Sequence, residues 1–194
     1  MTLIARGKHL EAIRKNGLTI QKLWDESRET LPVKACTAEE YKEIPDVILV
    51  CVKGYSMDET VPTIKKIAGK ETVVIPILNI YGTGGRLQKK LPELTVTDGC
   101  IYVSANILEP GVILQHGKIL RVVFGARKPE EETEKMREVA KDMVTDDLEV
   151  ILSENIRRDA MVKFSYVSPI GTAGLYCNAV AADFQREGEQ REMF

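Results

Sequence analysis

The chain has 194 residues, of which 44% are hydrophobic and 29% are charged, a composition typical of a globular domain with a sizeable core. Its formal net charge is −2 and no apolar run approaches the roughly 20 residues of a membrane span, so neither nucleic acid nor a membrane is expected as a partner. The four cysteines lack paired CxxC spacing, which indicates reduced thiols in a cytoplasmic protein.

Short alternating elements are expected in the first quarter of the chain. Residues 2–5 form an apolar run that predicts a strand, and a short helix follows it and ends at Gly17. Residues 18–20 predict a second strand. Residues 31–35 are expected to be an edge strand, because Pro32 has no N–H to donate to a neighbouring strand.

The centre of the chain predicts a strand–helix–strand unit. Residues 46–52 and 73–78 are rich in Val and Ile, as in strands buried on both faces of a sheet. Apolar residues recur between them at helical spacing. Ligands of open α/β sheets bind beyond the carboxyl ends of the strands, so Lys53 and Asn79 are candidate binding residues. A surface lysine and a turn-forming asparagine are the alternatives.

The second half predicts a turn and helix, further strands and a long final helix. The ranges expected are strands at 99–106, 119–125 and 148–152 and a charged helix at 130–143. Ser153 or Asn155 can cap the final helix, which places Lys163 among apolar residues. The alternation of strands and helices predicts an α/β fold.

Two charged residues outside the central unit are further candidates. Arg6 follows the first strand, where an arginine can pair with the 2′-phosphate of a dinucleotide, although an exposed arginine at a strand end is the commoner case. Apolar surroundings would lower the pKa of Lys163, so that it could transfer a proton near neutral pH. The alternative is a lysine on the solvated side of an amphipathic helix.

Two kinds of site are not expected from the motifs. No G-x-G-x-x-G is present, and the run GTGG at residues 82–85 lacks the lysine and serine of a P-loop, so we interpret it as a turn before a helix. His9 and His116 stand alone without the spacing of metal ligands, so no metal site is predicted.

The candidate residues lie in a series of short motifs: TLIARG with Arg6, NGLTI, DVILVCVKGYS with Lys53, VVIPILN with Asn79, DGCIYVSANILEPGVILQHGK, and RRDAMVKF with Lys163. In order and spacing this series resembles the ketopantoate reductase (2-dehydropantoate 2-reductase) family. The resemblance implies a Rossmann-type core and NADPH-dependent reduction of a 2-oxo acid to the 2-hydroxy acid. It further implies that Arg6 selects NADP, that Lys53 and Asn79 line the nicotinamide and substrate crevice, and that Lys163 is the general acid.

The chain departs from the family pattern in several places. It starts where the second strand of the family would be, so the first strand and its Gly-rich turn are missing, and only the first long helix of the second domain remains. Two family asparagines that follow the lysine fall at Val167 and Gly171, and an Asn-Gly turn is replaced by Asn79-Ile80. We therefore expect an incomplete Rossmann-type dinucleotide-binding domain in residues 1–153 and a remnant of a C-terminal helical domain in residues 154–194.

Two further expectations follow from these departures. A catalytically inactive homologue, persisting as an oligomeric scaffold or binding protein, is the alternative to an active reductase. A missing central strand would leave an unpaired sheet edge, which predicts a homo-oligomer.

Overall fold

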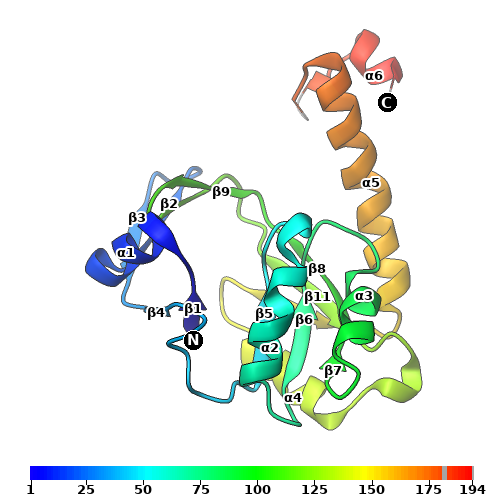
Figure 1. The fold of residues 1–194 in the computed structure, drawn as a ribbon. Coiled ribbons are helices and arrows are strands. Elements are labelled where there is room, and N and C mark those ends of the chain that lie inside the picture. The colour runs from blue at the N-terminus through cyan, green and yellow to red at the C-terminus, as the bar shows by residue number, and fades with distance from the viewer. Residues whose placement is uncertain (181–182, 194) are drawn as a thin grey trace.

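A mixed β-sheet forms the centre of the molecule in the computed structural model, which describes residues 1–180 and 183–193 (Figure 1). It consists of two three-stranded sheets, which together are called the main sheet. One is ordered β5 (Val47–Val50), β6 (Val73–Pro76) and β7 (Thr95–Val96), and the other is ordered β12 (Glu149–Leu152), β11 (Arg121–Gly125) and β8 (Asp98–Tyr102). The first three are parallel, β8 is antiparallel to β11, and β11 is parallel to β12. Only Thr97 separates β7 from β8, so this stretch of chain joins the two halves of the sheet. The α/β fold is confirmed.

Helices cover both faces of this sheet. The helices α2 (Val61–Ile67) and α3 (Thr83–Lys90) share one apolar core with β6, and α4 (Glu134–Met143) shares a second core on the opposite face. The strand β6 is buried along its whole length, because Val74 faces the first core while Val73 and Ile75 face the second. The prediction of a strand buried on both faces is therefore confirmed for β6.

The neighbouring strand β5 was expected to be equally buried, and this prediction is wrong. Leu49 is 39% exposed, and Ile4 at the end of β1 (Thr2–Ile4) is 44% exposed. Within the described chain, β5 pairs only with β6, and β1 pairs only with β4 (Lys34–Cys36). The outer edge of β5 consequently has no strand beside it, which leaves part of its surface open to solvent.

A second group of elements lies beside the main sheet. It contains α1 (Gly7–Asn16), the β1–β4 pair, and a four-stranded sheet ordered β3 (Arg28–Leu31), β2 (Leu18–Lys22), β10 (Val112–Gln115) and β9 (Ala105–Glu109). The single edge strand predicted at residues 31–35 is wrong. Pro32 lacks a donor, so β3 ends before it, and the chain enters a different sheet as β4. The strand expected at residues 99–106 is likewise divided between β8 and β9.

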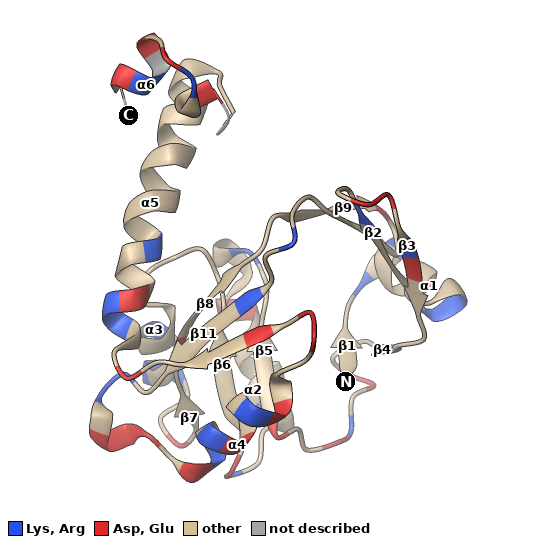
Figure 2. Ribbon diagram, turned by 180° about the vertical axis from the view of Figure 1, so that it is seen from behind, with Lys and Arg blue, Asp and Glu red and all other residues tan. Residues whose placement is uncertain are grey.

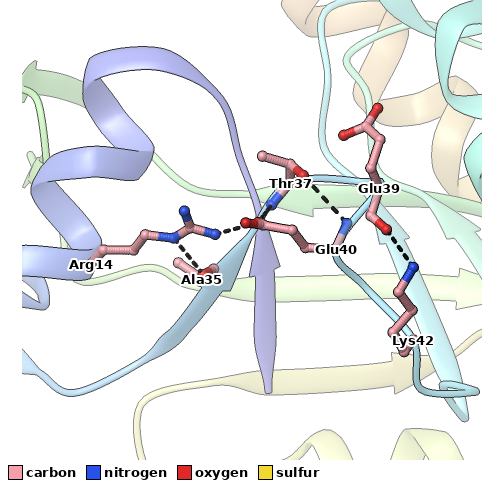
Figure 3. A network of polar contacts seen from close by, with 6 residues as sticks. All are labelled: Arg14, Ala35, Thr37, Glu39, Glu40 and Lys42. Atoms are coloured by element: carbon pink, nitrogen blue, oxygen red, sulfur yellow. Dashed lines mark hydrogen bonds and ion pairs between the residues drawn. The ribbon is translucent and has the colours of Figure 1, made fainter.

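A polar network fixes α1 to the turn after β4 (Figure 3). Arg14 donates from Nε to the Ala35 carbonyl at 3.1 Å and forms an ion pair with Glu40. The Glu40 carboxylate also accepts from the Thr37 amide at 2.7 Å. The carbonyl of Glu39 accepts from Lys66 of α2 at 3.2 Å, which connects this turn to the main sheet's helices.

The helix α5 (Ile156–Cys177) extends away from the sheet (Figure 1), and α6 (Glu189–Met193) lies near its far end. The start of α5 is capped as predicted, because the Asn155 side chain accepts from the Arg158 amide at 3.1 Å. Beyond Lys163 the helix carries no charged residue (Figure 2), yet Leu175 and Tyr176 are 89% and 81% exposed. No helix among the described residues is long and apolar enough to cross a membrane.

Short 3-10 turns complete the described chain. They are η1 (Gly54–Ser56), η2 (Asp58–Thr60), η3 (Pro129–Glu131) and η4 (Asp183–Gln185).

Candidate functional site

Lys163 and Asn79 meet at the junction of α5 with the main sheet. The Lys163 ammonium donates to Asn79 Oδ1 at 2.6 Å and to the carbonyl oxygen of Ile101 at 2.5 Å. Lys163 lies two turns into α5, Asn79 follows β6, and Ile101 belongs to β8. The structure therefore brings together two of the four candidate residues, which are 84 positions apart in the sequence.

The surroundings of Lys163 favour loss of its proton. Burial lowers the pKa of the Lys163 ammonium below its usual value, while the nearby Cys100 acts in the opposite direction. The ammonium lies 5.4 Å from the centre of the Tyr102 ring, a distance at which the ring face attracts a cation. Burial also raises the pKa of the Tyr102 hydroxyl and of the Cys100 thiol. Lys163 is thus the group in this site whose pKa moves towards neutrality.

A small pocket adjoins the ammonium. Its volume is about 20 Å³, and Asn79, Gly99, Cys100, Lys163 and Val167 are among its lining residues. This volume holds about one water molecule, far less than the several hundred Å³ of an ordinary ligand site. The aromatic rings of Tyr81 and Phe164, also in the lining, lie 6.2 Å apart. The pocket beside the ammonium therefore has room for about one water molecule.

Lys53 and Arg6 lie outside this contact, and they follow strands of two different sheets, β5 and β1. Lys53 is exposed after β5, and a side chain at the next residue, Gly54, would collide with Ile80, which follows Asn79 directly. Arg6 lies beyond β1 with its side chain 88% exposed, and its Nη1 is 3.9 Å from the Glu59 carboxylate. Within the described chain, neither residue has a hydrogen bond or ion pair with Asn79 or Lys163.

The sequence gives little indication of the β8 residues in this site. The Ile101 acceptor is a backbone carbonyl, which no residue type signals. Tyr102 follows it at the end of a strand, where an aromatic residue is common for packing reasons alone. The only available signal is their place in the motif DGCIYVSAN, which the family resemblance includes.

Among the described residues, no three or more His, Cys, Asp or Glu side chains converge into a group that could hold a metal ion. His9 Nδ1 accepts from the Gly111 amide at 3.0 Å, and His116 Nε2 lies 2.6 Å from Asn106 Oδ1. These two contacts hold loops of the four-stranded sheet.

Comparison with known proteins identifies similar sequences. Residues 1–129 match the family model described as ketopantoate reductase PanE/ApbA. The chain is 31% identical over 176 residues to a 2-dehydropantoate 2-reductase of Pyrococcus horikoshii, covering 88% of this chain and 55% of that protein. It is 27% identical over 181 residues to one of Mesorhizobium japonicum, covering 84% and 55%. The chain thus spans about half the length of the curated relatives it matches.

Solved structures show the same likeness. The crystal structure of 2-dehydropantoate 2-reductase from Porphyromonas gingivalis has a TM-score of 0.81 and 30% identity, covering 92% of this chain and 62% of that one. A ternary structure of D-mandelate dehydrogenase with NADH and anilino(oxo)acetate also gives a TM-score of 0.81, covering 99% and 61%. Its 18% identity makes it a comparison of fold alone.

Proposed function

We propose that this chain, which belongs to the ketopantoate reductase family, acts in the NADPH-dependent reduction of a 2-oxo acid to the 2-hydroxy acid. The observation that carries the proposal is the contact of Lys163 with Asn79 at the carboxyl end of β6. Ligands of open α/β sheets bind at this edge. A half-buried lysine held by two acceptors in that position fits a proton donor to a substrate carbonyl.

The hydrogen bonds of Lys163 leave it one free donor. An ammonium has three N–H groups, and Asn79 Oδ1 and the Ile101 carbonyl accept from two of them. We infer that the third is directed at the carbonyl oxygen of the substrate. Asn79 and Ile101 are then positioning groups, because they fix the ammonium without touching the reacting atoms.

The proton balance of the reaction follows from this arrangement. When bound, NADPH supplies the hydride that reduces the carbonyl carbon. The positive charge of Lys163 stabilises the negative charge that develops on the carbonyl oxygen. Its proton then passes to that oxygen, which gives the hydroxyl group and leaves Lys163 as a neutral amine. Because burial lowers the pKa of Lys163, this transfer costs less than it would from an exposed lysine.

Arg6 and Lys53 are the proposed contacts for the cofactor. Both are exposed cations just beyond the carboxyl ends of parallel strands, where a dinucleotide lies in this type of fold. The 3.9 Å pair of Arg6 with Glu59 is exposed and therefore weak, so a phosphate can replace Glu59 as its partner. A guanidinium that binds the 2′-phosphate would favour NADP over NAD.

A homo-oligomer is the proposed assembly. The observation in its favour is the uncharged, exposed surface of α5 beyond Lys163, together with the open edge of β5. Large exposed apolar side chains on such an uncharged helix, among them Leu175 and Tyr176, are candidates for burial against a second copy. Sedimentation velocity at several concentrations tests this, and a monomer at every concentration would contradict it.

The function itself is tested with the purified protein, NADPH, ketopantoate and a panel of other 2-oxo acids. Loss of NADPH absorbance that depends on the 2-oxo acid supports the proposal. A separate titration follows NADPH binding by fluorescence. Absence of both turnover and NADPH binding in folded protein would contradict the proposal and favour the alternative of an inactive homologue.

A further inference from the structure

A second, larger cavity lies against α3 and shares no lining residue with the Lys163 pocket. Its volume is about 760 Å³, within the range of small-molecule binding sites. Its walls come from α3, from the loop that leads into β7, and from the chain between β11 and η3. Pro92, Leu94, Val96 and Met136 give it an apolar side.

The polar side of the cavity is predominantly cationic. Arg86, Lys89 and Arg127 line it, and Glu131 is its one acidic lining residue, so three positive charges and one negative charge leave +2. Glu131 already has partners, with its carboxylate 3.3 Å from the Lys128 ammonium and 3.8 Å from Arg127 Nη2. Within the described chain, neither the Arg86 nor the Lys89 side chain has a hydrogen bond or ion pair.

Arg127 provides an independent indication of a ligand. Its Nε is buried and has no hydrogen-bond partner among the described residues. Its Nη2 has only a long contact of 3.4 Å with Gln88 Oε1 and the distant carboxylate of Glu131. Buried N–H groups in proteins almost always have an acceptor, so this guanidinium is short of partners within the described chain. Its side chain is 24% exposed and lines the cavity, so an oxygen-bearing molecule there can accept from the guanidinium. Guanidinium groups bind phosphate and carboxylate through two parallel hydrogen bonds.

We propose that this cavity binds a small organic anion whose phosphate or carboxylate group contacts Arg86, Lys89 and Arg127. An apolar part of the same molecule lies against Leu94, Val96 and Met136. This site is separate from the proposed reductase site, since Asn79 and Lys163 take no part in it. Nothing in the proposed reaction requires it.

Isothermal titration calorimetry with inorganic pyrophosphate and with citrate tests the proposal, at about 150 mM salt to suppress non-specific attraction. The informative variants are Arg86→Ala, which removes an exposed charge, and Arg127→Lys, which keeps the charge but removes the paired donors of the guanidinium. The matched control is Lys65→Ala, because Lys65 is an exposed cation on α2 that lines neither of the two cavities. Lys163→Ala is the control for the reductase site.

The expected result is saturable binding of at least one probe, weakened about tenfold or more in Arg86→Ala and Arg127→Lys. The Lys65→Ala and Lys163→Ala variants should bind as the unmodified chain does. Tighter binding of pyrophosphate identifies the natural anion as a phosphate, and tighter binding of citrate identifies it as a carboxylate. No binding of either probe up to about 10 mM, or equal weakening in Lys65→Ala, would overturn the proposal.

Discussion

Replacing Gly84 by alanine should destabilise the protein through the joint between β7 and β8. A Cβ at this position would overlap the Thr97 carbonyl oxygen and lie 2.5 Å from Asp98 Oδ1 and 2.8 Å from the Thr97 carbonyl carbon. Thr97 cannot retreat easily, because its amide donates to the Val74 carbonyl at 3.0 Å. The helix α3 must therefore move away, which breaks the 2.8 Å hydrogen bond from the Gly84 amide to the buried Asp98 carboxylate.

The magnitude follows from these two effects. Losing a hydrogen bond to a charged group costs about 1.5–3 kcal/mol, and a forced backbone shift costs about 1–3 kcal/mol. We therefore expect Gly84→Ala to lower the free energy of unfolding by about 3–5 kcal/mol. Domains of ordinary stability have about 5–15 kcal/mol in total, so this loss is severe.

Gly85 offers a matched control on the same helix. A Cβ at Gly85 would meet only Arg127 Nη1 at 3.6 Å, an ordinary contact. Alanine favours helix over glycine by about 1 kcal/mol, so Gly85→Ala should be neutral or stabilising. Urea unfolding followed by circular dichroism measures both variants. A loss below about 1 kcal/mol in Gly84→Ala, or equal changes in the two variants, would refute the steric argument.

Three further predictions concern charge. Burial raises the pKa of the Asp98 carboxyl, against the lowering effects of the Gly84 amide and Arg127. The contribution of the protonated Asp98 carboxyl to stability is therefore fully present below the unfolded pKa of 3.8 and is lost as pH rises through the folded pKa. Asparagine does not ionise, so Asp98→Asn should gain stability relative to the unmodified chain as pH rises from acid to neutral. Urea unfolding at several pH values measures this difference. The proposed reduction should slow as pH rises through the pKa of Lys163, which lies below its usual value of 10.5. Asn79→Asp places a negative charge 2.6 Å from the ammonium, so it should raise this pKa and move the alkaline limb of the pH–rate profile to higher pH. An unmoved limb would exclude Lys163 as its source. Arg6→Ala should raise the KM for NADPH by about 10- to 150-fold and leave the KM for NADH unchanged, since a phosphate contact of this kind contributes about 1.5–3 kcal/mol. Equal effects on both cofactors would contradict the role of Arg6.

The sequence was most informative where local patterns decide the structure. The apolar run of β6 predicted burial on both faces, and the position of Asn79 after it predicted a side chain at the carboxyl edge of the sheet. The cap at Asn155 was one of the two predicted alternatives, because its side chain and the following amides are neighbours in the chain. These features depend on residues close together in sequence.

Features that depend on distant contacts were not predictable in the same way. The exposure of Leu49 results from which strands lie beside β5, and its apolar sequence would suit either environment. Lys163 finds the Ile101 carbonyl only because α5 packs on β8, a contact between segments that are 62 residues apart. Lys163 and Asn79 were each predicted from their own local sequence, and their contact results from the fold.

In the proposed reaction, Lys163 donates the proton and NADPH the hydride. The most direct measurement compares kcat/KM for the 2-oxo acid between the unmodified chain and Lys163→Ala, with the Kd of NADPH measured for both. We expect kcat/KM to fall by about 10²–10⁴-fold while the Kd for NADPH stays the same. A variant that keeps full activity while binding NADPH normally would contradict this role of Lys163.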